Sequence, residues 1–315
     1  MTEQKSNALE ELKVEAEKTP GLVGFTCPKD NQSKPFEWCF KHCKARCEPL
    51  PILIAMSSRR KIVENLYSVT EILNPPQIVY MQRHFSYYVL PKNQTFITFG
   101  TGWHYAFERA KYKIKDLGLE KDYIIENGGK YFEVEIETKA GTANLRGTPD
   151  LYIVPEKHLW DFKTMKYYYT AKNLIEHEDW GDSTIPWQVN IYRVYDFIEA
   201  EKITVEALIK DFKRNLKEKG VEPIMQFPVP IMRDETVKEF VKAKLAYLLE
   251  VEKDPSILRQ CTHEERWIVA NERNKDHGKP LRCLEYCNVS SFCPQFQDRG
   301  SLNFEIPTCA EDIPL

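Results

Sequence analysis

Two β-type segments separated by only two residues constrain the fold of this chain more than any other feature of its sequence. Residues 143–154 (ANLRGTPDLYIV) and 157–163 (KHLWDFK) both favour extended structure, and only Pro155 and Glu156 lie between them. Such a short connection predicts a tight antiparallel hairpin. The chain is therefore expected to contain a sheet built on this hairpin.

The hairpin would gather three ionisable residues. It would set Asp150 close to Asp161, and Lys163, two positions beyond Asp161, would point to the same face of the second strand. Two carboxylates suit Mg²⁺ or Mn²⁺, and a neighbouring lysine can orient a water molecule or stabilise phosphate charge. The pattern indicates a site for phosphodiester cleavage. The alternative is a surface hairpin with ordinary polar residues.

Further motifs flank the hairpin in a definite order. Upstream, residues 99–108 (FGTGWHYAFE) place His104 at the start of a helical segment. Downstream, residues 187–192 (WQVNIY) place Gln188 and Tyr192 four positions apart, about one helical turn. The chain thus carries G-T-x-x-H, G-x-P-D, D-x-K and Q-x-x-x-Y in succession, and this succession is more specific than any one of the motifs.

The succession of motifs resembles that of the PD-(D/E)xK nuclease superfamily. It is most similar to the RecB-like exonucleases, including the CRISPR-associated and phage enzymes with cysteine-bound iron–sulfur clusters. The resemblance covers roughly residues 68–195, and the cysteine-rich tail also fits it. It implies an α/β fold with a restriction-endonuclease-like core, a small mixed sheet flanked by helices, and cysteine-rich segments at the two ends.

The resemblance also implies roles for individual residues. A divalent cation, Mg²⁺ or Mn²⁺, would be held by His104, Asp150, Asp161 and the backbone carbonyl of Phe162. An imidazole ligand would favour Mn²⁺, because it is softer than a carboxylate. Lys163 would position the attacking water or help to deprotonate it. Gln188 and Tyr192 would contact the nucleic acid or the water, although both side chains have a simple packing role as the alternative.

Cysteines near the C-terminus suggest a second kind of site. Cys283, Cys287 and Cys293 form a C-x3-C-x5-C group, and Cys261 lies upstream of it. The resembling enzymes use three late cysteines of similar spacing and one cysteine placed before the nuclease core. We expect Cys261 to replace that early ligand, so that these cysteines hold a [4Fe–4S] cluster. Zn²⁺ is the rival metal, and a quartet that includes one early cysteine is the remaining option.

Four further cysteines lie near the N-terminus: Cys27, Cys39, Cys43 and Cys47. In an unbroken helix, Cys39 and Cys47 would lie ~12 Å apart, too far to share one ion. Either the helix breaks between them, or only a pair of these residues binds together. A second metal, with Zn²⁺ favoured, is one hypothesis for this group. Buried thiols that pack as small apolar side chains are the other.

Local patterns predict the remaining elements. Ser68 and Glu71 have the spacing of a helix capping box, and residues 20–50 are expected to be irregular. Helices are predicted for residues 1–18, 100–117, 187–200 and 234–251, and strands for residues 131–138, 203–212 and 223–230, with a helix as the alternative for residues 203–212. From residue 254 onward we expect loops. The resulting organisation is an N-terminal cysteine-rich extension (1–60), a nuclease core (61–253) and a C-terminal metal-binding lobe (254–315).

Composition bears on the cellular compartment in which the protein is expected and on the partners that it can bind. The chain has 315 residues, 42% of them apolar and 29% charged, and its net charge of −3 argues against a broadly basic coat. No apolar run approaches the ~20 residues of a membrane span, and the N-terminus lacks the apolar stretch of a signal peptide. Nine cysteines fit metal binding better than disulfides in a reducing compartment. We therefore expect a cytoplasmic protein of a bacterium or a phage-infected cell.

The sequence thus predicts a divalent-metal-dependent DNA nuclease. An exonuclease acting on single-stranded DNA or DNA ends, in recombination, repair or CRISPR-type DNA processing, is favoured by the resemblance. The alternative is a non-catalytic DNA-binding or complex-assembly subunit with cysteine-bound metals. A nuclease directed at RNA is a third interpretation.

Overall fold

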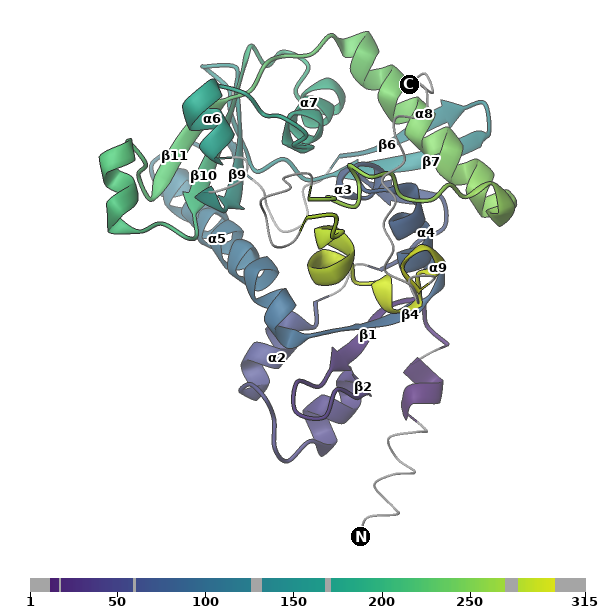
Figure 1. Ribbon diagram of the computed structural model, residues 1–315. Coiled ribbons are helices and arrows are strands. Elements are labelled where there is room, and N and C mark those ends of the chain that lie inside the picture. The colour runs from purple at the N-terminus through teal and green to yellow at the C-terminus, as the bar shows by residue number, and fades with distance from the viewer. Residues whose placement is uncertain are drawn as a thin grey trace. The chain divides into compact units, whose positions relative to one another are not determined.

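The computed structural model places the chain in two compact units, with a mixed α/β architecture of small sheets flanked by helices (Figure 1). The structure describes residues 12–16, 18–58, 61–125, 132–167, 171–269 and 277–297, except for the side chains of residues 96, 103, 107 and 108. Unit 1 comprises residues 1–60, 75–93 and 256–315, and unit 2 comprises residues 61–74 and 94–255. Most of the helix predicted for residues 1–18 lies outside the described residues.

Unit 1 contains a three-stranded sheet. Its central strand, β1 (Gly21–Thr26), pairs antiparallel with β2 (Ser33–Pro35) and parallel with β4 (Ser86–Val89). The prediction of irregular structure for residues 20–50 is therefore wrong for residues 21–26, 33–35 and 38–42, which form strands and a helical turn. The reason is that the apolar run of β1 is buried in the core of the unit, and its strand partner β4 is distant in sequence.

Short helices complete unit 1. Those beside the sheet are η1 (Trp38–His42), α2 (Leu50–Met56) and α4 (Pro76–His84). The tail is loop-rich, as predicted, with the brief helical turns η5 (Arg282–Tyr286), η6 (Ser290–Phe292) and α9 (Pro294–Gln297). The side chain of Tyr87 packs against both hydrophobic clusters of the unit, one around Cys39 and the other around Cys261 and Cys293.

Unit 2 is built on a five-stranded sheet. Its strand order is β11 (Ile224–Pro228), β10 (Lys202–Ile209), β9 (His158–Met165), β8 (Leu151–Ile153) and β5 (Tyr123–Ile125). Strands β9 and β10 are parallel, and the other pairs are antiparallel. A parallel pair needs a long crossover, which here contains α6 (Lys172–His177) and α7 (Ile185–Tyr195).

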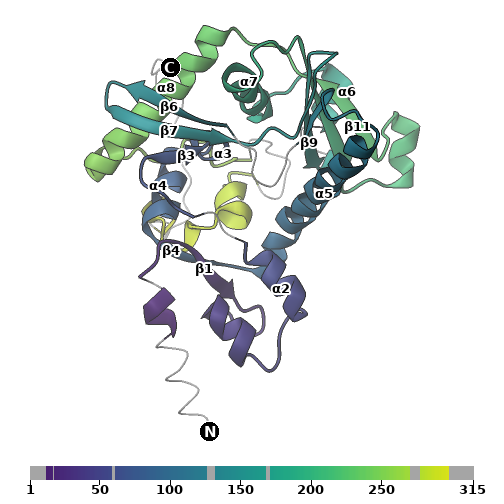
Figure 2. The same ribbon diagram turned by 180° about the vertical axis from the view of Figure 1, so that it is seen from behind.

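A second sheet of unit 2 has the order β3 (Leu66–Ser68), β7 (Gly141–Gly147) and β6 (Phe132–Thr138). Strand β3 leads into α3 (Val69–Ile72), where Ser68 and Glu71 form the predicted capping box. The long helix α8 (Asp234–Lys253) lies along β6 and β7, with Val237, Val241 and Leu245 fully buried (Figure 2). Helix α5 (Pro91–Asp116) and the short turn η3 (Arg214–Lys219) complete the described elements of this region.

The segment 143–154 does not form the single strand that the sequence predicts. Strand β7 ends at Gly147 and β8 begins at Leu151, and the two strands belong to different sheets. Pro149 lies at the break, because proline has no N–H to donate to a sheet. The hairpin itself is present, since β8 and β9 pair antiparallel with Leu151 opposite Trp160.

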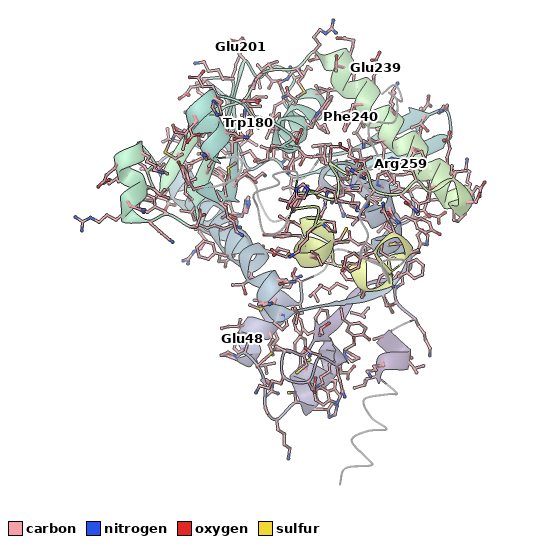
Figure 3. All side chains as sticks on the ribbon, viewed as in Figure 1. Glu48, Trp180, Glu201, Glu239, Phe240 and Arg259 are labelled. Atoms are coloured by element: carbon pink, nitrogen blue, oxygen red, sulfur yellow. The ribbon has the colours of Figure 1, made fainter. Side chains whose placement is uncertain are left out.

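Helix α7 is fixed on two sides by its own side chains. The fully buried Asn190 accepts a hydrogen bond from the Met232 N–H at 2.9 Å and donates to the Pro230 carbonyl at 3.0 Å. The ring of Trp187 stacks on Phe240, with centroids 4.1 Å apart, and Figure 3 labels Phe240 on α8. These contacts set the position of the side chains that α7 presents to β9.

Among the described residues, no helix has both the length and the apolar character needed to cross a lipid bilayer.

Candidate functional site

Asp150 and Asp161 meet at the base of the β8–β9 hairpin. Asp150 directly precedes β8, and Asp161 follows Trp160, which pairs with the first residue of β8. The Phe162 N–H donates to Asp150 Oδ2 at 2.6 Å, and this bond ties the loop carboxylate to the strand. Both aspartates are buried. The sequence correctly identified the hairpin as the element that would bring these carboxylates together.

Lys163 and Asp161 form an ion pair on one face of β9, between a buried carboxylate and an amine whose side chain is 23% exposed. The distance from Lys163 Nζ to Asp161 Oδ2 is 2.6 Å, and Asp161 is only 1% exposed. Lys163 is the partner of this buried oxygen, so a divalent cation bound to Asp161 would compete with the ammonium group for it.

Burial controls the protonation of this pair. Burial, with the nearby Asp150 carboxylate, raises the pKa of Asp161 to about 6, although Lys163 acts in the opposite direction. Burial disfavours the charged form of Lys163, but the carboxylates of Asp161 and Asp150 outweigh it and raise the pKa of the amine. Lys163 is therefore a permanent ammonium group near neutral pH in this structure.

His104 reaches the site from helix α5. Its Nδ1 lies 3.2 Å from Asp150 Oδ1, on the carboxylate whose other oxygen accepts the Phe162 N–H. The imidazole also interacts electrostatically with Asp161. His104 thus joins the two carboxylates.

Gln188 and Tyr192 approach the same group of residues from α7. Gln188 Nε2 donates to the Tyr192 hydroxyl at 2.8 Å. Burial raises the pKa of Tyr192 to about 12, and the phenol also interacts with the charges of Lys163, Asp161 and Asp150. The tyrosine is therefore neutral near pH 7, and its hydroxyl can donate a hydrogen bond.

Gly147 is a positional requirement that sequence reasoning missed. A Cβ added to Gly147 would lie 2.5 Å from a ring atom of Phe132 and 2.8 Å from a ring atom of Tyr192. The ring of Tyr192 can therefore pack over β7 only where residue 147 has no side chain. The glycine of the G-x-P-D motif is visible in the sequence. The steric reason for it appears only once the fold places the Tyr192 ring of α7 against it.

The site residues predicted in unit 2 thus lie together: His104, Asp150, Asp161, Lys163, Gln188 and Tyr192. The backbone N–H of Phe162 belongs to the site because it donates to Asp150, and the sequence did not suggest this contact. The donors are carboxylate oxygens and one imidazole, a set that suits Mn²⁺ or Mg²⁺. Within the described part of the chain, however, no three His, Cys, Asp or Glu side chains are already arranged to hold a metal ion. A cation at this site would have to take the Asp161 oxygen that now faces Lys163.

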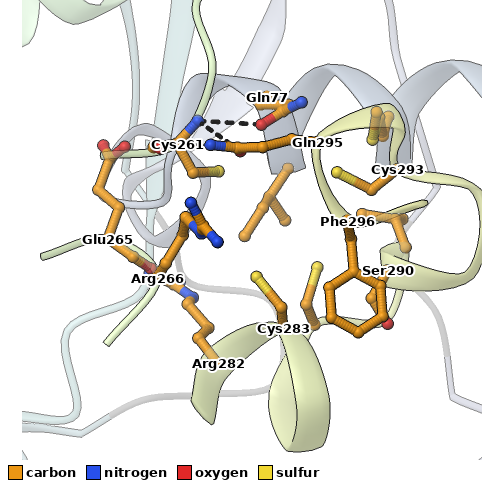
Figure 4. Close-up of a pocket in the computed structure, with 14 residues that line it drawn as sticks. Gln77, Cys261, Glu265, Arg266, Arg282, Cys283, Ser290, Cys293, Gln295 and Phe296 are labelled. Atoms are coloured by element: carbon orange, nitrogen blue, oxygen red, sulfur yellow. Dashed lines mark hydrogen bonds between the residues drawn. The ribbon is translucent and has the colours of Figure 1, made fainter. Parts of the chain in front are cut away.

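The tail cysteines converge on one pocket of unit 1, shown in Figure 4. Cys261, Cys283, Cys287 and Cys293 all line it, and its volume, counted with the open space at its mouth, is about 360 Å³. Of these four, Cys261 and Cys293 are buried, and all four are free thiols. The C-x3-C-x5-C group and its upstream partner therefore share one place, and the donor set is that of a Cys₄ centre.

Polar groups hold the upstream cysteine of this pocket. The Cys261 N–H donates to Gln77 Oε1 at 3.0 Å and to Gln295 Oε1 at 3.1 Å (Figure 4). Burial, with lesser repulsion from Glu265 and the other three thiolates, raises the pKa of Cys261 to about 12. Metal binding at this pocket would therefore release protons from the thiols.

Two arginines line the same pocket, and the sequence gave no indication of them. Arg266 favours the thiolate form of Cys283, although burial raises the pKa of that thiol. Burial lowers the pKa of Arg282, and the nearby thiolates and Glu265 act in the opposite direction. Cationic groups beside a thiolate cluster offset its negative charge.

Comparison with known proteins adds little to this geometry. No protein-family model matches the chain, and no curated protein matches it. A solved structure described as the crystal structure of SSO0001 aligns with a TM-score of 0.45 and 14% identity, over 77% of this chain and 94% of the other. Similarity at this level identifies neither a family nor an activity.

Proposed function

We propose that this protein is a divalent-metal-dependent deoxyribonuclease whose PD-(D/E)xK-type core lies in unit 2. The observation that carries the proposal is the pair of buried carboxylates, Asp150 and Asp161, beside the ammonium group of Lys163. Asp161 Oδ2 lies 2.6 Å from Lys163 Nζ. The motif resemblance of the sequence supports the same reaction class.

The cost of this arrangement argues for a functional role. Removing charged groups from water costs several kcal/mol per ion, and a buried ion pair rarely repays that cost in full. Here two buried carboxylates lie beside a partly buried amine, with an electrostatic partner in His104. Perturbed ionisable groups gathered in this way are typical of active sites.

Each residue has a distinct task in the proposed reaction. Asp150 and Asp161 would hold the cation with His104 and the Phe162 carbonyl. A bound divalent cation would lower the pKa of a water molecule and offset charge on the scissile phosphate. Lys163, as an ammonium group, would donate hydrogen bonds to a phosphate oxygen or to the water. Its raised pKa makes it a poor proton acceptor, so we favour this role over that of a general base.

Tyr192 and Gln188 would orient the nucleic acid or the water. The Gln188 amide donates to the Tyr192 oxygen, so the phenolic proton is left to point elsewhere. A neutral phenol near an ammonium group is a suitable donor to a phosphate oxygen. The preferred substrate is single-stranded DNA or a DNA end, in keeping with the enzymes that the motif order resembles.

The tail pocket would hold a [4Fe–4S] cluster through Cys261, Cys283, Cys287 and Cys293. The convergence of four thiols and two arginines supports an anionic thiolate centre at this place. The pocket and the carboxylate site belong to different units of the chain. We therefore assign the cluster a structural role.

The proposal is tested with single- and double-stranded DNA labelled at either end, incubated with and without Mn²⁺. Metal-dependent cleavage that vanishes in Asp161→Ala would support a nuclease, and the product ladder would give its polarity. Binding without cleavage would favour a DNA-binding or assembly subunit. Cleavage confined to a matched RNA would redirect the proposal to that substrate.

A further inference from the structure

The four N-terminal cysteines form a second thiol group, separate from the tail pocket. Cys39 is buried in the cluster formed by Leu22, Phe25, Leu53, Met56 and Val89, and Cys47 packs against this cluster. Cys39 interacts electrostatically with Cys43, Cys47 and Cys27. Cys47 interacts with Cys27 as well. Four thiols from three segments are therefore neighbours.

The backbone around these thiols repeats that of the tail pocket. Cys39 and Cys43 enclose a single wide turn, in which the Cys43 N–H donates to the Trp38 carbonyl at 3.0 Å. Cys283 and Cys287 enclose the same turn, with the Cys287 N–H donating to the Arg282 carbonyl at 2.7 Å. The second cysteine is extended in both cases, with φ −74° and ψ 112° at Cys43, and φ −85° and ψ 111° at Cys287. One local structure thus presents a C-x3-C pair at two places in unit 1.

This turn removes the geometric objection that a continuous helix raises. The helical turn η1 ends at His42, and Cys43 is already extended. Arg46 then donates to the carbonyls of Cys39, at 3.2 Å, and Phe40, at 2.6 Å, so the chain folds back before Cys47. Cys47 is thereby returned toward Cys39.

The first cysteine is held by the β1–β2 hairpin. The Cys27 N–H donates to the Gln32 carbonyl at 2.9 Å, and the Asn31 N–H donates to the Cys27 carbonyl at 2.8 Å. The Cys27 thiol contacts Asp30 and the buried amine of Lys34, which are paired with each other. The ammonium group of Lys34 would therefore lie beside a Cys27 thiolate and offset part of its charge.

We propose that Cys27, Cys39, Cys43 and Cys47 form a structural Zn²⁺ site. Four thiolates with a C-x3-C pair are a common ligand set for structural zinc, which prefers tetrahedral sulfur coordination. The thiols are neighbours but not yet arranged as a ligand set, so zinc binding would turn their side chains inward. The zinc would stabilise a region whose sheet has one six-residue strand and two shorter strands.

The test measures metal content and does not depend on nuclease activity. Full-length protein, expressed with zinc and iron supplied, is analysed by elemental mass spectrometry as wild type and as Cys43→Ser, Cys287→Ser and Cys309→Ser. Cys309, which the sequence spacing assigns to neither cysteine group, serves as the matched control. We expect Cys43→Ser to lose about one zinc per chain. The Cys287→Ser and Cys309→Ser variants should keep this zinc.

A second measurement covers the case in which Cys43→Ser does not fold. Wild-type protein and Cys287→Ser are loaded with Co²⁺, and both should give the thiolate charge-transfer and intense d–d absorption of a tetrahedral cobalt site. Removal of zinc from wild type should increase hydrogen exchange mainly within residues 21–58. The proposal is overturned if Cys43→Ser keeps its full zinc content, if folded wild type binds no zinc or cobalt, or if Cys287→Ser retains iron at the N-terminal thiols.

Discussion

Lys163 and Asp161 lie two residues apart on β9 and form an ion pair, with 2.6 Å between the partly buried Nζ and the buried Oδ2. Because alternate residues of a strand share a face, the D-x-K spacing is sufficient to create this pair. The β8–β9 hairpin then adds Asp150, helix α5 adds His104 and helix α7 adds Tyr192. The D-x-K motif thus forms a charged site together with residues from the β8–β9 hairpin, helix α5 and helix α7.

Gly147→Ala should damage the site without removing any of its polar groups. The new Cβ would overlap the rings of Phe132 and Tyr192, and overpacking of this kind costs about 1–3 kcal/mol. We expect a lower free energy of unfolding in urea titrations, and slower DNA cleavage because Tyr192 is displaced. Gly102→Ala on α5 is the matched control, since its Cβ meets nothing within 4 Å. Equal unfolding free energies and equal cleavage rates in the two variants would show that the close approach at Gly147 does not affect stability or activity.

Tyr192→Phe should reduce turnover more than substrate binding. The substitution keeps the ring that packs on Phe132 but removes the hydroxyl that Gln188 contacts. A fall in kcat of roughly tenfold or more, with little change in KM, is expected for a donor that acts mainly on the transition state. Steady-state kinetics on labelled DNA in Mn²⁺ measure both constants. An unchanged kcat would leave Tyr192 with a packing role only.

His158 should make the fold sensitive to acid. Burial lowers the pKa of His158, although Glu156 acts in the opposite direction, and its Nε2 lies 2.8 Å from Thr204 Oγ1. The unfolded chain therefore takes up a proton at a higher pH than the folded chain does. As a result, stability is lost as the pH falls below about 6.5. Urea unfolding at pH 7.5 and pH 5.5 should give a smaller difference in His158→Gln than in wild type, and an equal difference would exclude His158 as the cause.

Cys287→Ser should remove the iron–sulfur cluster that we propose for the tail pocket. Protein purified without oxygen should be brown, with broad absorption near ~400 nm from thiolate–iron charge transfer. The variant should be colourless and less protected from proteolysis from about residue 254 onward, because metal binding contributes folding free energy. Cys309→Ser should keep the colour. A colourless wild type with zinc in this pocket would replace the cluster by zinc, and a metal-free pocket would contradict both assignments.

Local sequence signals were sufficient for several features. The hairpin that joins Asp150 to Asp161 follows from two extended segments and a short turn. The capping box at Ser68 and Glu71 follows from side-chain spacing alone. Helix α8 follows from the period of its buried valines and leucines. In each case the determining interactions lie within a few turns or one hairpin of the sequence.

Other features depend on contacts between distant segments, which the sequence does not encode locally. Strand β1 pairs with β4, which lies more than 50 residues further along the chain. No local signal therefore predicts a strand at β1. The break at Pro149 separates two sheets, and only their strand partners reveal it. Gln77 acquires its role from Cys261, which lies 184 positions further along the chain. Such roles appear only when the fold is known.

The most direct test of the account is a cleavage assay of Asp161→Asn and Lys163→Ala in Mn²⁺, with Asp116→Asn as an exposed control on α5. Circular dichroism and thermal melting first establish that each variant is folded. The account predicts metal-dependent DNA cleavage by wild type and the control, and a loss of at least about 100-fold in both site variants. Cleavage by folded Asp161→Asn and Lys163→Ala at the wild-type rate would contradict it.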